Sequence, residues 1–291
     1  MTARTSNGNG LRERSAIETR RYLEKDFKPL HNMALAQIRR IDVANVLSEI
    51  KSPAAHNRAR STLSKFFAWA VGKGWCDVNP VVGTIKAEGE SKRERVLTND
   101  EIAAIWLNGQ NGYGTILKLL LLTGCRRDEI GGLKWSEVDL NARLITIPGS
   151  RTKNKQEHII PLSEEASKLL AGVAPREGYE HVFGRTMAAG FGGWSSAKSE
   201  LDEIVKIDDW RLHDLRRTAA TQMAELGVLP HIIEACLNHI SGHKSGVAGV
   251  YNRATYLPEK KKAFDQWAHH IKTIVAQATG ANVTALKKKQ H

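Results

Sequence analysis

The sequence predicts a mainly α-helical protein of two domains: a small N-terminal helical bundle, then an α+β domain with a small antiparallel sheet. The chain has 291 residues, which exceeds one typical domain. Apolar residues recur at helical spacing through most of it, whereas two short runs, RLITIP (143–148) and EHIIPL (157–162), are rich in β-branched residues. Those two runs predict the strands of the sheet.

The N-terminal part reads as three helices after a polar tail. Residues 1–12 have too few apolar side chains to order themselves, and we expect disorder there. The helical domain is expected over 13–82, with Asp42 as a candidate helix cap. The apolar face of its third helix is predicted at Ala59, Leu63, Phe66, Phe67 and Ala70. Arg58 and Lys65 lie on another face and are candidate DNA-binding residues, unless that face is merely solvated.

A linker and a second domain follow. Residues 83–96 combine glycine and dense charge with little apolar periodicity, which is typical of a linker. The second domain is expected over 97–291, opening with a capping box formed by Thr98 and Glu101. Its two predicted strands bracket GSRTKNKQ (149–156), a hairpin with a basic tip, and most of the rest is helical.

The composition points to a polyanionic partner. The formal net charge is +12, which favours double-stranded DNA over other partners. The longest apolar run, residues 116–122, is far shorter than the ~18 residues that a membrane span needs. There is no apolar signal segment at the N-terminus, and three cysteines cannot all pair, so we expect a reducing cytoplasm and no membrane partner.

Candidate chemistry lies in four separated stretches. In TGCRRDEI (123–130), Gly124 ends an apolar helix and Arg126 lies just beyond. RTKNK (151–155) is the basic hairpin tip. In HDLRRT (213–218), His213 and Arg216 are three apart and share one helical edge. In the fourth stretch, a helix expected from Pro230 to His239 leads through a Gly/Ser-rich loop to Tyr251.

These residue types suit a tyrosine nucleophile acting on a phosphodiester. Two guanidinium groups can stabilise the charge that develops on the phosphate oxygens, and a lysine or histidine can protonate the leaving oxygen. The chain offers Arg126, Arg216, Lys153 and the histidines for these roles. Because cations can replace a metal ion here, no metal and no cofactor is expected.

In this order, the four stretches resemble the tyrosine recombinases of the phage integrase family, closely over 97–267 and loosely over 14–80. The resemblance implies a clamp around duplex DNA formed by a core-binding and a catalytic domain, and a tetramer on two synapsed sites without any cofactor. An accessory DNA-bending protein is a further candidate partner. The site residues implied are Tyr251 as nucleophile, Arg126 and Arg216 on the phosphate, Lys153 as general acid, His213 and His239 in the pocket, and Glu129 in support. Beside Lys153 on the hairpin tip, Arg151 and Lys155 are candidates for contacting DNA, unless they are simply solvated.

Two departures leave alternatives open. The usual Leu-Gly-His is Leu237-Asn238-His239 here, and His243 is a second candidate for the last histidine. The chain also has no room for the N-terminal arm-binding domain of many integrases, so we expect either a simpler recombinase or a piece of a longer one.

Competing interpretations remain. Cys236, His239 and His243 have a spacing that could hold zinc, but a fourth ligand is not evident. Residues 218–239 could pass for the helix-turn-helix of a non-catalytic repressor. A metal-dependent nuclease would need clustered acids, and the acids here are scattered. Tyr256 reads as a packing residue. The helix around KAFDQWAHHIKTIV (262–275) could dock on a neighbouring subunit or on its own domain.

Overall fold

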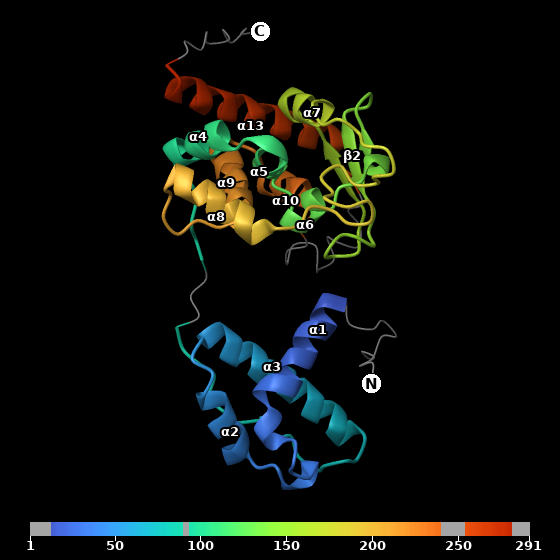
Figure 1. The fold of residues 1–291 in the computed structure, drawn as a ribbon, viewed down its shortest axis with the longest axis vertical. Helices are drawn as coiled ribbons and strands as arrows, with labels where there is room; N and C mark the ends of the chain where they lie inside the picture. Colours follow the sequence, from blue (N-terminus) through green and yellow to red (C-terminus); the bar gives the residue numbers. More distant parts are fainter. Residues whose placement is uncertain (1–12, 90–92, 240–253, 281–291) are drawn as a thin grey trace. The chain divides into compact units, whose positions relative to one another are not determined.

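The computed structural model describes residues 13–89, 93–239 and 254–280 and divides the chain into two compact units that meet between Arg93 and Glu94 (Figure 1). The first unit is helical, and the second combines helices with one three-stranded antiparallel sheet. The predicted fold class is confirmed. The tail expected at 1–12 lies outside the described residues. Among the described helices, none has the length and apolar character needed to cross a bilayer.

The first unit packs its helices around one apolar core. Its elements are α1 (Glu13–Arg21), η1 (Tyr22–Asp26), η2 (Lys28–Leu30), η3 (Leu35–Gln37), α2 (Arg40–Ser48) and α3 (Pro53–Gly72). On α3, Ala59, Leu63 and Phe67 are buried, while Arg58 and Lys65 are exposed. The predicted apolar and basic faces of this helix are therefore confirmed.

Asp42, the predicted helix cap, lies inside the first turn of α2 and does not precede the helix. Helix α2 begins at Arg40, with Arg39 as the residue before it. Asp42 is the third residue of the helix, and its carboxylate accepts a hydrogen bond from the Arg39 backbone N–H at 2.9 Å. The carboxylate thus caps the helix from inside its first turn, where it also meets the positive end of the helix dipole.

The linker expected over 83–96 is shorter than predicted. The Asn57 side chain on α3 pairs with the backbone of Ala87, donating to its carbonyl at 3.1 Å and accepting from its N–H at 3.0 Å. Arg60 donates to Thr84 Oγ1 at 2.8 Å. At the other end, Arg95 pairs with Glu101 in the second unit. Residues at both ends of the stretch therefore belong to the folded units.

The second unit is built around α5 (Asn111–Thr123), most of whose residues are buried. Helices α4, α6, α7, α9 and α13 contact it. Among the described residues, the other helices of this unit are α4 (Asn99–Asn108), α6 (Arg127–Gly131), η4 (Trp135–Glu137), α7 (Glu164–Ala171), α8 (Trp194–Val205), α9 (Leu212–Glu225), α10 (Pro230–Cys236) and α13 (Leu257–Ala278). The predicted capping box is present, because Thr98 Oγ1 accepts from the Glu101 N–H and Glu101 accepts from the Thr98 N–H.

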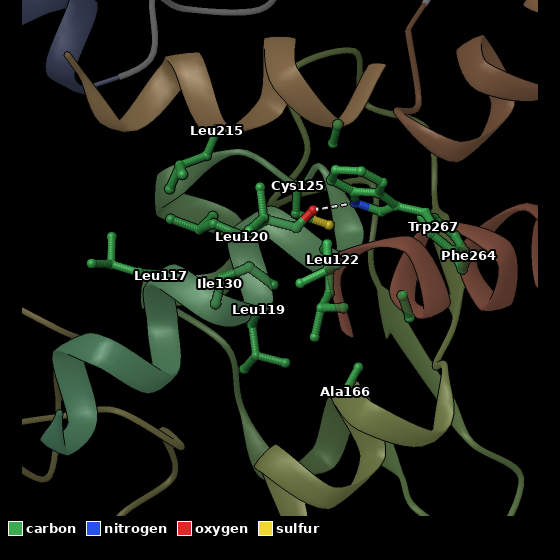
Figure 2. Close-up of a cluster of buried hydrophobic side chains, with 14 of the residues drawn as sticks. Leu117, Leu119, Leu120, Leu122, Cys125, Ile130, Ala166, Leu215, Phe264 and Trp267 are labelled. Atoms are coloured by element: carbon green, nitrogen blue, oxygen red, sulfur yellow. Dashed lines mark hydrogen bonds between the residues drawn. The ribbon is translucent and has the colours of Figure 1, made fainter. Parts of the chain in front are cut away.

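Helix α13 docks on its own unit. It contacts α4, α10 and β3 (His158–Pro161), and Figure 1 shows it crossing the unit in red. Phe264, Trp267 and Ile271 are buried, and the Trp267 indole donates to the Leu121 carbonyl of α5 at 2.8 Å (Figure 2). The apolar face predicted for this helix therefore packs within its own domain. Of the two predicted alternatives, self-docking is confirmed, and docking of this face on a neighbouring subunit is wrong.

The sheet has the order β1-β2-β3, with β1 (Val138–Asp139) paired to β2 (Leu144–Ile147) and β2 to β3. Ile145 lies opposite Ile160 and Ile147 opposite His158, and all four side chains are buried. The predicted hairpin is confirmed. Strand β1 was not predicted, because its two residues are too few to show alternation.

Candidate active site

The C-terminal end of α5 places Arg126. Gly124 has φ of 61°, a left-handed conformation that glycine adopts without strain, and a side chain there would come within 2.6 Å of Leu237. The chain then turns into α6 at Arg126, whose guanidinium and N–H both donate to Glu129 at 2.8 Å. Glu129 is buried, so this charged pair fixes the direction of Arg126.

Arg216 ties two chain segments together. It lies on α9 and is buried, with Nη1 donating to the Gly124 carbonyl at 2.6 Å and Nη2 to the Leu237 carbonyl at 2.8 Å. A guanidinium group carries five N–H donors in a fixed plane, so three donors are not used by these two bonds. Arg216 can therefore hold the ends of α5 and α10 and still offer N–H groups to an anion.

His213 lies on the same helix and is exposed, although neighbouring groups still desolvate part of its ring. Burial lowers its pKa below the ordinary value, and the positive charges of Arg217 and Arg216 lower it further. Both effects favour the neutral imidazole, which can accept a proton or a hydrogen bond.

A cavity of about 620 Å³ brings three of the predicted residues together. Arg126, Lys153 and His213 all line it, although they come from the start of α6, the hairpin tip and α9. Lys153 is exposed at the tip. The cavity thus collects three basic side chains from three of the four predicted stretches.

The other two basic residues of the hairpin tip, Lys155 and Arg151, differ in their exposure and in their partners. Lys155 is exposed, in a left-handed turn with φ of 61°. Arg151 is turned inward: it pairs with the carboxylate of Glu137 and donates to the Glu129 carbonyl at 2.9 Å. Arg151 therefore connects the hairpin to the end of α6, a contact that its position in a basic run did not reveal.

Helix α10 ends earlier than predicted, at Cys236 rather than His239. Asn238 adopts a left-handed conformation with φ of 47°, and the His239 N–H closes the turn on the Glu234 carbonyl at 2.9 Å. His239 is exposed after this turn. Tyr251 and His243, the predicted nucleophile and the second histidine candidate, lie outside the described residues. Tyr256 packs against the core and meets the His231 ring at 5.3 Å, as a packing residue should.

Sequence reasoning missed part of the cavity wall. Lys198 of α8, Trp210 and Arg211 also line it. Lys198 lies over the Trp210 ring at 4.0 Å and pairs with Asp202 at 2.6 Å. The four-residue spacing of Lys198 and Asp202 is a helical ion-pair signal, but it does not say which face the helix turns to the cavity.

Metal binding has little support in the described residues. Cys236 is buried, whereas His239 is exposed, and His243, the third member of the predicted zinc spacing, lies outside the described residues. A second group, Cys125, Glu129 and His158, brings possible ligand atoms within 4.8 Å of one another. Both Glu129 oxygens already accept hydrogen bonds from Arg126, and His158 Nε2 is bonded to the Cys236 carbonyl. These contacts favour a structural role for this group.

Comparison with known proteins agrees with this arrangement. Residues 95–256 match the phage integrase family, and residues 3–87 match the phage integrase central domain. The prophage integrase IntZ of Escherichia coli (strain K12) is 29% identical over 92% of this chain and 68% of its own length. The shufflon-specific DNA recombinase of Escherichia coli is 31% identical over 76% of this chain and 57% of its own length.

A solved structure shares the fold. The structure of a lambda integrase (75–356) dimer bound to a COC′ core site superposes with a TM-score of 0.66 at 20% identity, covering 80% of this chain and 90% of that one. Because the match to the phage integrase family, over residues 95–256, covers more than half of the chain, the chain belongs to that family. It is a tyrosine-type site-specific recombinase with a core-binding and a catalytic domain, and the repressor alternative is not favoured.

Proposed function

We propose that this protein is the integrase of a prophage or other mobile element, and that it cleaves and rejoins double-stranded DNA through a 3′-phosphotyrosyl intermediate on Tyr251. The observation that supports it best is the cavity shared by Arg126, Lys153 and His213, with Arg216 bound to the backbone beside it. Relatives of similar sequence include a prophage integrase and a DNA recombinase. The family match extends to residue 256 and so includes Tyr251.

In the proposed reaction, the Tyr251 hydroxyl oxygen bonds to the scissile phosphorus while the bond from phosphorus to the 5′-oxygen breaks. Arg126 and Arg216 donate hydrogen bonds to the two non-bridging oxygens, where negative charge increases in the transition state. Glu129 keeps Arg126 in place by accepting from both its side chain and its backbone. The phosphotyrosyl bond conserves the energy of the broken bond, so rejoining needs no cofactor.

Two protons move in this step. Lys153 gives one to the departing 5′-oxygen, and the phenol of Tyr251 loses one as it attacks. The lowered pKa of His213 makes it a suitable acceptor for hydrogen bonding or proton transfer in the pocket. His239, exposed at the end of α10, is proposed to contact the phosphate or the phenol.

DNA binding is proposed to involve both units. Arg58 and Lys65 offer an exposed basic face on α3, and Lys155 extends from the hairpin. Arg151 is assigned to holding the hairpin, because its guanidinium pairs with Glu137. Solved structures of similar fold include a lambda integrase dimer on a core site and a lambda integrase tetramer on a Holliday junction. We propose the same tetrameric assembly here, acting on chromosomal DNA in the cytoplasm, with an accessory DNA-bending protein as a candidate partner.

The test is covalent trapping on a nicked suicide substrate in the presence of a chelator, after the cognate site has been mapped. We expect a protein–DNA adduct on a denaturing gel with wild-type protein and with Tyr256→Phe, and none with Tyr251→Phe. Tyr256 is the matched control, since it is a tyrosine five residues away that packs against the core.

The other outcomes are equally informative. Tight binding to a confirmed site without any adduct would contradict the proposal and favour a repressor. An adduct that is lost only in Tyr256→Phe would move the nucleophile, and an adduct that the chelator abolishes would show that a metal takes part.

A further inference from the structure

We infer that Asn154 and Asn238 form a clasp that positions Lys153 and His239 for the reaction. Neither asparagine was predicted as a site residue, and each is the direct neighbour of one that was. The inference rests on the proposed function, since it concerns how the general acid of that site is held. Asn154 and Asn238 are positioning residues, because they would act through their neighbours.

The two side chains meet across a large sequence separation. The Asn154 amide donates to the Asn238 side-chain oxygen at 2.8 Å and to its backbone carbonyl at 3.1 Å, over 84 residues of sequence. In return, the Asn238 amide lies 3.4 Å from the Asn154 side-chain oxygen and 3.3 Å from the Gln156 carbonyl, to both of which it donates. The tip of the hairpin and the end of α10 are thus joined by bonds in both directions.

The backbone at position 238 explains why asparagine fits there. Its φ is 47°, in the left-handed region that side-chain-bearing residues rarely enter. Asparagine enters it more readily than most residues, and glycine enters it freely but has no amide to donate. An asparagine at this position therefore closes the helix as glycine would and adds the bonds to the hairpin.

The clasp completes a continuous chain of contacts around the site. Leu237, the residue before Asn238, accepts from Arg216, and Arg216 also donates to Gly124, two residues before Arg126. These contacts connect all four predicted stretches. The hairpin tip is bonded to the end of α10, the end of α10 to Arg216 of α9, and Arg216 to the end of α5. Lys153 is exposed and directly precedes Asn154, so the link from Asn154 to α10 holds the backbone next to Lys153.

The base of the hairpin is held separately. His158 at the start of β3 bonds to the Cys236 carbonyl at 2.9 Å, and Lys260 of α13 contacts the Ile159 carbonyl. These bonds do not involve Asn154 or Asn238. Loss of the clasp should therefore loosen the tip without unfolding the sheet, which makes the inference testable by substitution.

The experiment compares two leaving groups. In a substrate whose scissile 5′-oxygen is replaced by sulfur, the leaving thiolate needs no proton, because a thiol has a pKa near 8.5. A defect in proton donation disappears on this substrate, while a defect in phosphate binding or folding does not. The variants are Lys153→Ala, Asn154→Ala and Asn238→Gly, with Asn141→Ala, an exposed asparagine in the β1–β2 turn, as matched control.

On the oxygen substrate we expect single-turnover cleavage to fall about 10²-fold or more in Lys153→Ala and about tenfold in Asn154→Ala and Asn238→Gly. On the sulfur substrate all three should approach the wild-type rate, and Asn141→Ala should match wild type on both. Asn238→Gly preserves the left-handed turn, so its defect would report the lost amide.

Two results would overturn the clasp while leaving the proposed function intact: an Asn154→Ala variant as fast as wild type on oxygen, or one equally slow on both substrates while Lys153→Ala is rescued by sulfur. Failure of sulfur to rescue Lys153→Ala would instead remove Lys153 as the general acid, and with it the basis of the clasp. Melting curves of the three variants distinguish local loosening of the hairpin tip from unfolding of the whole domain. A large loss of thermal stability in Asn154→Ala would also count against the inference.

Discussion

Two regions of this protein present basic side chains, and they hold them in different ways. At the candidate active site, Arg216 is buried and bonded to two backbone carbonyls, and Arg126 is paired with a buried carboxylate. On α3 of the first unit, Arg58 and Lys65 are exposed. The first arrangement fixes direction as well as charge, whereas the second supplies charge on a surface.

The difference matches what each region must do. Stabilising a transition state requires donors already aimed at the place where charge develops, since reorganising them during the reaction costs energy. Attraction of duplex DNA requires only that cations neutralise phosphates and release counterions, which long exposed side chains do without fixed geometry. Burial with defined partners therefore distinguishes a cation that acts on one phosphate from a cation that attracts the duplex.

The largest effect is expected at the buried arginine. A lysine at position 216 keeps the charge but cannot span the Gly124 and Leu237 carbonyls while also donating to a phosphate, because it has one compact ammonium group. We expect Arg216→Lys to reduce the single-turnover cleavage rate about 10² to 10³-fold at saturating protein. Arg58→Lys is the matched control on the exposed face and should leave this rate unchanged. A loss smaller than tenfold in Arg216→Lys would remove the contrast between the two regions.

A second effect concerns pH. Burial lowers the pKa of His158 to about 3, and the positive charge of Lys260 makes the second-largest contribution to this shift. In the unfolded chain the imidazole takes up its proton near pH 6.5, so between these values the unfolded state binds more protons than the folded state. The contribution of His158 to stability is thus fully present above pH 6.5 and is lost as the pH falls toward 3.

From this the free energy of unfolding should decrease by about 1.4 kcal/mol per pH unit below pH 6 on account of His158. Urea unfolding at a series of pH values measures the slope, and His158→Gln should flatten it even though the variant is less stable at pH 7. Equal slopes in the two proteins would show that His158 is not buried as a neutral group.

The smallest effect is expected on the exposed face. Removing both charges with Arg58→Ala and Lys65→Ala should weaken DNA binding several-fold at about 0.1 M salt and reduce the slope of log K against log salt by about 1 to 2. The cleavage rate at saturation should not change. Binding titrations at several salt concentrations measure the slope, and an unaltered slope would mean that this face is merely solvated.

Local patterns predicted many of the elements well. The apolar stripe of α3, the capping box at Thr98 and the stop at Gly124 depend on residues a few positions apart, and all three are present. One helix end was misplaced because of a backbone turn. Helix α10 ends at Cys236 because Asn238 takes a left-handed turn, and nothing in the periodicity of the helix signals that turn.

Only some of the residues that line the cavity were predicted from the sequence. Arg126, Lys153 and His213 were recognised by their residue types and spacing, and the structure brings them to one cavity. Arg151 could not be separated from its basic neighbours, because its pairing with Glu137 depends on how the hairpin folds back on α6. Lys198 and Arg211 were missed, since only the packing of α8 beside the start of α9 turns them toward the same cavity.

By itself, the sequence determined the helices, the hairpin and the kinds of side chain available for phosphoryl transfer, because each is written in residues close together along the chain. Only the tertiary structure decided which backbone carbonyls Arg216 reaches across 92 residues and which asparagine holds the hairpin tip across 84. A carbonyl acceptor is present at every residue and therefore leaves no mark in a sequence, so the contacts that aim the catalytic groups become visible only once the chain has folded.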